Sequence, residues 1–306
     1  MTVEADGIGS GDVDTRWASL FEVETLAETD LGMNPAALCF KCKCSHGCST
    51  LITDPELIGA QFWSAGVNPV GDRGGVLGTL EQIDGFKSQL RTLSAATGLA
   101  RRAGDLDQIA SSGKIASLIG VSGTSAFDGS AAALRMLAEL GVTYVSLTDA
   151  DVSFADDDLP QLVAQIGVLG MLLHASGTSD ENTSKLIELA DGPILVSSPA
   201  GHRVNGDVLA KVKDKGGLVL AVPGASEAET AEDLGYLLHE LGTDGVGLAT
   251  GDLAADHGTS SDHQAPVFPM VRRALASRKV SDGDIDKVVG GNLARVWEAA
   301  ERAVRR

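Results

Sequence analysis

Basic residues are scarce in this sequence. It holds 24 Lys and Arg against 42 Asp and Glu, which gives a formal net charge of -18 at pH 7. Proteins that bind nucleic acid or anionic membrane surfaces need a basic patch to neutralise phosphate groups. The charge balance therefore argues against both kinds of partner.

Long apolar runs are also missing. No stretch approaches the roughly 18 to 20 apolar residues that a membrane span needs. The N-terminal segment MTVEADGIGS lacks the basic and apolar regions of a secretion signal, so we expect a cytoplasmic protein. With 306 residues and 43% hydrophobic content, the chain can build a substantial core.

Cysteine is absent everywhere except in the segment CFKCKCSHGC, residues 39–48, which holds Cys39, Cys42, Cys44 and Cys48. In a cytosolic chain such a cluster more often binds metal or performs redox chemistry than forms structural disulfides. Four thiolates satisfy zinc, whereas the C-x-C step suits a softer ion such as copper(I). A redox site, an ordinary surface loop and a modified-peptide segment remain alternatives.

From about residue 59 onward, short apolar runs alternate with helical patterns, which is typical of an α/β protein with a parallel sheet. One such helix is SAAALRMLAELG, where Leu134 and Leu137 follow the helical period. An eighth strand near the N-terminus would close a (β/α)8 TIM-type barrel. The seven apolar runs are residues 59–66, 114–121, 142–148, 168–174, 193–198, 217–222 and 245–250.

Functional side chains of such barrels lie on the loops that follow the strands. The expected strand ends offer few catalytic groups, chiefly Asp149 and His174. Asp149 begins the acidic stretch DADVSFADDD, whose last three carboxylates we interpret as a solvated loop. Asp149 itself, directly after a strand, is the better candidate for a site residue.

Several segments together resemble the membrane (renal) dipeptidase family, the binuclear zinc dipeptidases of the amidohydrolase-like barrel. They are QFWSAGVNP, KIASLIGVSG, LAELGVTYVSLT, HASGTSDENTSKLIELADGPILVSS and, near the C-terminus, VSDGDIDKVVGGNLARVWEAAE. The resemblance covers residues 54–303 at least and implies a barrel and a homodimer. It divides the chain into a divergent N-terminal segment, 1–58, with the Cys-rich loop 39–48, and a barrel with C-terminal helices, 59–306.

The family's metal ligands carry over only in part. The resemblance implies a first-strand metal pair at GDVDTRW, with Asp12 in place of histidine and Asp14 kept, and a zinc-binding histidine kept at His174. Serines stand where the family has its bridging glutamate (Ser122) and its second zinc-binding histidine (Ser198). The family's metal aspartate falls on Gly251. Its substrate-contacting histidine and arginine correspond to Asp149 and Arg203.

Two zinc ions need a bridging carboxylate and several further ligands. Our leading interpretation is therefore a pseudoenzyme-like barrel with a degenerate binuclear site and weak or no dipeptidase activity. Its mouth is either repurposed for a small peptide or amino-acid-derived ligand or vestigial. A metallo-hydrolase or lyase with one zinc at Asp12, Asp14, Asp149 and His174 is the enzymatic alternative. The other is a metal-binding scaffold, or a fused modified-peptide precursor, acting through the cysteine cluster. His174 is equally consistent with a hydrogen-bonded residue packed in the barrel mouth.

Overall fold

The computed structural model of the chain describes residues 20–21, 60–66, 74–154, 158–198, 203–222, 226–250 and 267–304. The cysteine cluster, Asp12 and Asp14 lie outside these residues, so the predictions that rest on them stay predictions. The division at residue 58 also stays a prediction. One described strand, Leu20–Phe21, falls before that boundary and pairs with the last strand of the sheet.

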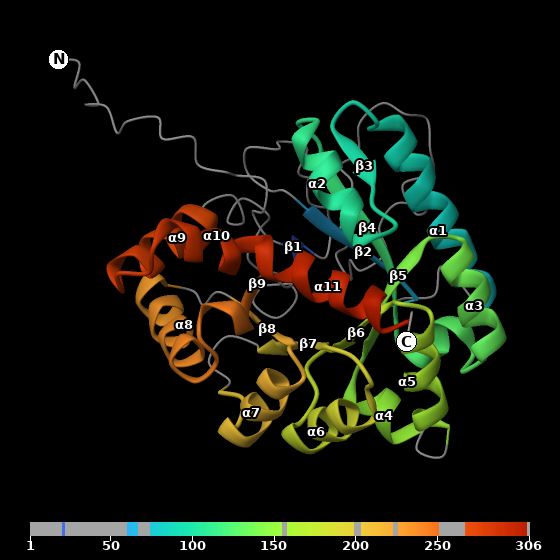
Figure 1. Ribbon diagram of the computed structural model, residues 1–306. Helices are drawn as coiled ribbons and strands as arrows, with labels where there is room; N and C mark the ends of the chain where they lie inside the picture. Colours follow the sequence, from blue (N-terminus) through green and yellow to red (C-terminus); the bar gives the residue numbers. More distant parts are fainter. Residues whose placement is uncertain are drawn as a thin grey trace.

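The strands form one curled parallel sheet in the order β1-β9-β8-β7-β6-β5-β4-β2, surrounded by helices (Figure 1). The two ends of this order, β1 and β2, contact each other, which brings the sheet round into a barrel. The predicted α/β barrel is therefore confirmed. The strand near the N-terminus begins at residue 20, after the segment GDVDTRW that the resemblance gave for it and that lies outside the described residues. The strands are β1 Leu20–Phe21, β2 Ala60–Ala65, β4 Ile115–Ser122, β5 Val142–Leu147, β6 Leu172–Ala175, β7 Ile194–Ser198, β8 Leu218–Ala221 and β9 Val246–Thr250.

Two details differ from the sequence prediction. The run 168–174 is only partly a strand, because helix α5 extends to Val168 and a turn with Gly170 at a φ of 66° separates it from β6. A positive φ suits glycine and ends the helix there. The short strand β3, Thr97–Leu99, was not predicted, and it pairs with the start of β4 at Ile115.

Five of the helices begin at a polar side chain that caps them. Ser130, Ser179, Asn205, Ser226 and Ser281 each accept a hydrogen bond from a backbone N–H in the first turn of the next helix. The predicted helix SAAALRMLAELG is α3, Ala131–Glu139, and its Leu134 and Leu137 are buried as expected. The others are α1 Gly75–Thr92, α2 Ala103–Ser111, η3 Thr124–Phe127, α4 Asp149–Phe154, α5 Leu159–Val168, α6 Asp180–Leu189, α7 Gly206–Asp214, α8 Glu227–Leu241, η4 Thr243–Gly245, α9 Val267–Ser277, α10 Asp282–Asp286 and α11 Asn292–Ala303.

Alternation along the strands creates two apolar layers. One layer packs between sheet and helices, and the other fills the barrel interior with residues such as Phe62, Tyr144 and Leu195. The Tyr144 ring lies 4.6 Å from the ring of Phe62 and directly over Gly120, where a Cβ atom would come within 2.2 Å of it. Gly120 is therefore required for Tyr144 to fill the barrel centre. No helix among the described residues is long and apolar enough to cross a membrane.

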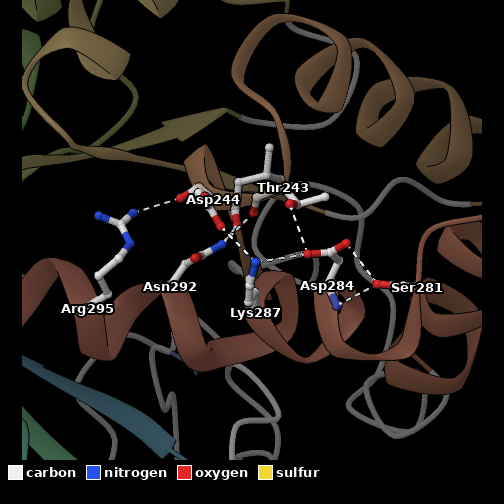
Figure 2. Close-up of polar contacts among 8 residues, drawn as sticks. Thr243, Asp244, Ser281, Asp284, Lys287, Asn292 and Arg295 are labelled. Atoms are coloured by element: carbon white, nitrogen blue, oxygen red, sulfur yellow. Dashed lines mark hydrogen bonds and ion pairs between the residues drawn. The ribbon is translucent and has the colours of Figure 1, made fainter.

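The C-terminal helix α11 crosses the barrel and adds Val296 and Trp297 to the interior layer (Figure 1). Its first residue, Asn292, is buried, and its amide donates to the backbone carbonyls of Thr243 at 2.6 Å and Val246 at 2.9 Å (Figure 2). Lys287 contacts the carboxylates of Asp244 and Asp284 nearby. The Gly-Gly-Asn segment thus anchors the C-terminal helices to the start of β9.

Candidate functional site

Four serines and one histidine line the carboxyl ends of consecutive strands and face the barrel interior. Each lies two residues after an interior position of its strand, as Ser64 does after Phe62 and Ser197 after Leu195, and therefore points to the same face. In the strand register Ser122 lies opposite Ser146, and Ser146 lies opposite His174. We call this set the serine–histidine arc: Ser64 on β2, Ser122 on β4, Ser146 on β5, His174 on β6 and Ser197 on β7.

His174 is held between two hydroxyl groups. Its Nδ1 lies 2.8 Å from Ser146 Oγ, and its Nε2 lies 2.5 Å from Ser197 Oγ. A neutral imidazole donates from one nitrogen and accepts at the other, so the two serines take opposite roles in this contact. The residue is 9% exposed, and the two hydrogen bonds hold its ring in one orientation at the barrel mouth.

Among the described residues, the interior layer directly beneath the arc is apolar. Tyr144 lies two residues before Ser146 on β5, and Leu172 lies two residues before His174 on β6. Both side chains face the barrel interior. On the other side Leu220 of β8 stands opposite Ser197 in the register. Low polarity around a hydrogen-bonded chain strengthens its bonds. The described part of the mouth therefore combines polar side chains on β2 and β4–β7 with the apolar Leu220 on β8.

The described residues do not fit a two-zinc centre. The resemblance implies a bridging carboxylate at Ser122, and the neutral hydroxyl of a serine is a poor zinc ligand. Among the residues that the structure describes, no three His, Cys, Asp or Glu side chains gather closely enough to hold a metal ion. His174, the ligand kept by resemblance, is engaged through both nitrogens by Ser146 and Ser197.

The carboxylate of Asp149 is hydrogen-bonded to the N-terminal end of helix α6. Its Oδ1 accepts hydrogen bonds from the Ser179 backbone N–H at 2.8 Å, the Ser179 hydroxyl at 3.1 Å and the Asn182 amide at 2.7 Å. The Asn182 amide, followed by the Ser179 backbone, lowers the pKa of Asp149 below its ordinary value. The structure thus places this predicted site residue against the first turn of α6, where an anion is favoured.

We expect Asp149→Asn to lower the free energy of unfolding by about 1 kcal/mol at pH 7, because charge-assisted bonds to α6 weaken. The folded-state pKa of Asp149 lies below the unfolded one, so its stabilisation is complete above pH ~4 and disappears as pH falls through the folded-state pKa. Urea unfolding at pH 7 and pH 3 checks this. Asp158→Asn, an exposed carboxylate that does not cap α5, is the control. An equal effect at both pH values contradicts the assignment.

Asp151 has a structural role that sequence reasoning missed. Its two carboxylate oxygens accept bonds from the backbone and hydroxyl of Thr124 and of Thr148, at 2.7 to 3.1 Å. The residue therefore ties the loop after β4 to the loop after β5. Both loops border the serine–histidine arc.

Arg203, the predicted substrate-binding cation, is directed toward helix α8. Its Nη2 lies 2.5 Å from Glu232 Oε1, its guanidinium carbon lies 5.3 Å from the centre of the Tyr236 ring, and the side chain is 54% exposed. The Tyr236 hydroxyl in turn donates to the Val204 carbonyl. The structure does not bring Arg203 together with His174, and its role in ligand binding stays a prediction.

Comparison with known proteins agrees with this architecture. An amidohydrolase from Pseudomonas aeruginosa superposes with a TM-score of 0.73 at 16% identity, covering 95% of this chain and 98% of that one. The probable dipeptidase PvdM from the same organism gives a TM-score of 0.72 at 15% identity, covering 95% and 97%. These two likenesses establish the shared fold.

The sequence also identifies the family to which the chain belongs. Dipeptidase 3 of Macaca fascicularis is 27% identical over an alignment of 287 residues, and the match covers 80% of this chain and 57% of that protein. The chain thus spans little more than half the length of this relative. The sequence pattern of the membrane dipeptidases, peptidase family M19, matches residues 53–306. The chain belongs to the membrane dipeptidase family.

Proposed function

We propose that the barrel mouth binds a small peptide or amino-acid-derived compound and does not act as a binuclear zinc dipeptidase. The observation that carries this proposal is the environment of His174, whose nitrogens meet the hydroxyls of Ser146 and Ser197 where the resemblance expects zinc chemistry. Ser122 and Ser198 supply no imidazole or carboxylate. A dipeptidase barrel with these residues would keep a polar mouth and lose its metals.

The chemistry of the mouth suits a peptide-like ligand. Serine hydroxyls both donate and accept, so the arc complements the carbonyl and N–H groups of an amide. Leu220, opposite Ser197, offers an apolar surface to a side chain of the ligand. Sites for small molecules commonly combine apolar walls with a few placed polar groups.

Zinc remains a candidate cofactor because relatives in this fold include proteins named as metallo peptidases. A single zinc at Asp12, Asp14 and His174 would have to displace Ser146 or Ser197 from the imidazole. Asp149 would have to leave α6. The cysteines at 39, 42, 44 and 48 are a second candidate site, for zinc or a softer metal such as copper, because the chain gathers all its thiols there.

A hydrolysis assay tests the proposal. The purified chain is incubated with an L-Ala-D-Ala-type dipeptide, with excess zinc or with a chelator, and released amino acid is measured. We expect zinc to change the rate by less than twofold, because the described mouth lacks a bridging ligand. Rates that rise at least a hundredfold with zinc, and fall again with His174→Ala, would contradict it. A variant with all four cysteines changed to serine separates the barrel from the cysteine cluster.

A further inference from the structure

We propose that Ser197, His174 and Ser146 form a metal-independent acyl-transfer site, with Ser197 as nucleophile, His174 as general base and Ser146 as the group that positions the imidazole. The substrate class is a small amide or ester of an amino acid. This inference deepens the proposed function and rests on it, because it uses the same barrel mouth and requires that no zinc occupy His174.

The geometry meets the requirements of an activated serine. Such a site needs a nucleophile within hydrogen-bond reach of a base, and a third group that orients the base. Ser197 Oγ lies 2.5 Å from His174 Nε2, and Ser146 Oγ lies 2.8 Å from Nδ1 on the far side of the ring. With the ring proton on Nδ1 and donated to Ser146, Nε2 is left to accept the Ser197 hydroxyl proton.

Exposure distinguishes the two serines. Ser146 is 1% exposed, whereas Ser197 is partly exposed at the carboxyl end of β7. The carboxyl ends of the strands form the face on which barrels of this type place their chemistry. An incoming carbonyl group therefore reaches Ser197 first, and Ser146 stays behind the imidazole as a positioning residue.

The reaction balances without a cofactor. Ser197 Oγ forms a bond to the carbonyl carbon while its proton moves to His174 Nε2. The carbon–nitrogen bond of an amide then breaks, and the nitrogen takes that proton and leaves as an amine. Water attacks the acylated serine, gives a proton to Nε2, and the carbon–Oγ bond breaks as Ser197 recovers the proton. One water is consumed, and an acid and an amine are produced.

The third group is a hydroxyl and carries no charge. It holds the ring and its tautomer but stabilises the imidazolium less than a carboxylate would. We therefore expect slow turnover together with clear nucleophilicity of Ser197. A covalent probe is a better reporter of this site than a turnover assay.

The test uses the full chain and an alkyl fluorophosphonate, in the presence of a chelator. Ser197 Oγ bonds to phosphorus, fluoride leaves, and the hydroxyl proton passes to His174. We expect one label per chain, located on Ser197 by peptide mass spectrometry. Ser197→Ala should carry no label there, and His174→Gln, which keeps hydrogen bonding without a base, should label at least about a hundredfold more slowly. Circular dichroism melting verifies that each variant is folded.

Ser146 is tested by rescue. Ser146→Ala should slow labelling about tenfold, and Ser146→Thr, which restores the hydroxyl, should recover most of the rate. Ser153→Ala, on the exposed face of α4, is the matched control and should label as the parent chain does. Three results would overturn the inference. The parent chain is labelled at a residue other than Ser197, it is not labelled at all, or the His174→Gln variant is labelled as fast as the parent chain. Zinc-dependent dipeptide hydrolysis would overturn the proposed function and this inference with it. An unlabelled Ser197 without such hydrolysis would overturn this inference alone.

Discussion

An Asn292→Ala variant should unfold with a free energy about 3 kcal/mol below that of the parent chain. The Asn292 amide is buried and donates to the carbonyls of Thr243 and Val246, at 2.6 and 2.9 Å (Figure 2). Each buried carbonyl that loses its donor costs about 1 to 3 kcal/mol. Because these carbonyls lie at the entry to β9, the loss loosens both the last strand and the helix that covers the barrel. Urea unfolding followed by circular dichroism measures the effect.

Two further variants isolate the cause of that loss. Asn292→Asp keeps the shape but turns a donor into a carboxylate facing two carbonyls, so it should destabilise at least as much as alanine. Arg295→Ala, one turn later, also removes bonds to backbone carbonyls, those of Gly216 and Asp244, but from a more exposed position. We expect it to cost less than about 1 kcal/mol. Equal losses from Asn292→Ala and Arg295→Ala would contradict the role given to the buried amide.

Replacing Gly120 by alanine should lower the free energy of unfolding by about 2 to 3 kcal/mol. The added Cβ would lie 2.2 Å from ring atoms of Tyr144, which is 1% exposed and packed against Phe62. A crowded interior cannot absorb this atom without moving the ring or the strand. Tyr144 lies two residues before Ser146 on the same face of β5, and Ser146 positions the His174 ring. We therefore expect the variant also to slow the labelling of Ser197 by the fluorophosphonate.

Gly235→Ala is the matched control for Gly120→Ala. Its Cβ would lie 2.1 Å from Arg278, a similar distance, but that guanidinium is the end of an exposed, flexible side chain. Alanine is also favoured over glycine within a helix by about 1 kcal/mol, so this change should be neutral or stabilising. A Gly120→Ala melting temperature equal to that of Gly235→Ala would show that Tyr144 does not constrain the barrel centre.

Most of the barrel could be predicted because its strands are buried on both faces and appear as continuous apolar runs. The run at 168–174 misled the prediction, since Val168 and Leu172 are both apolar and only the turn at Gly170 separates helix from strand. Strand β3 is three residues long and contains Gly98, which gives it no apolar pattern. Its pairing with β4 is a tertiary contact without a local signal.

The site was less accessible to sequence reasoning. His174 stands out because histidine is rare and ends a strand, but Ser146 and Ser197 look like ordinary strand residues. Counting every second residue from Tyr144 and Leu195 would have placed both serines on the inner face beside His174. Asp149 was predicted at a strand end and lies two residues after β5, as the first residue of α4. Its partner Asn182 lies on α6, a contact that only the fold creates.

The zinc content of the chain tests the central claim most directly. The variant with all four cysteines changed to serine is saturated with zinc, dialysed against metal-free buffer and analysed for zinc per chain. Without a bridging carboxylate at Ser122, and with His174 held by Ser146 and Ser197, we predict fewer than one zinc ion per chain. Two tightly bound zinc ions per chain, lost together in His174→Ala, would contradict the account.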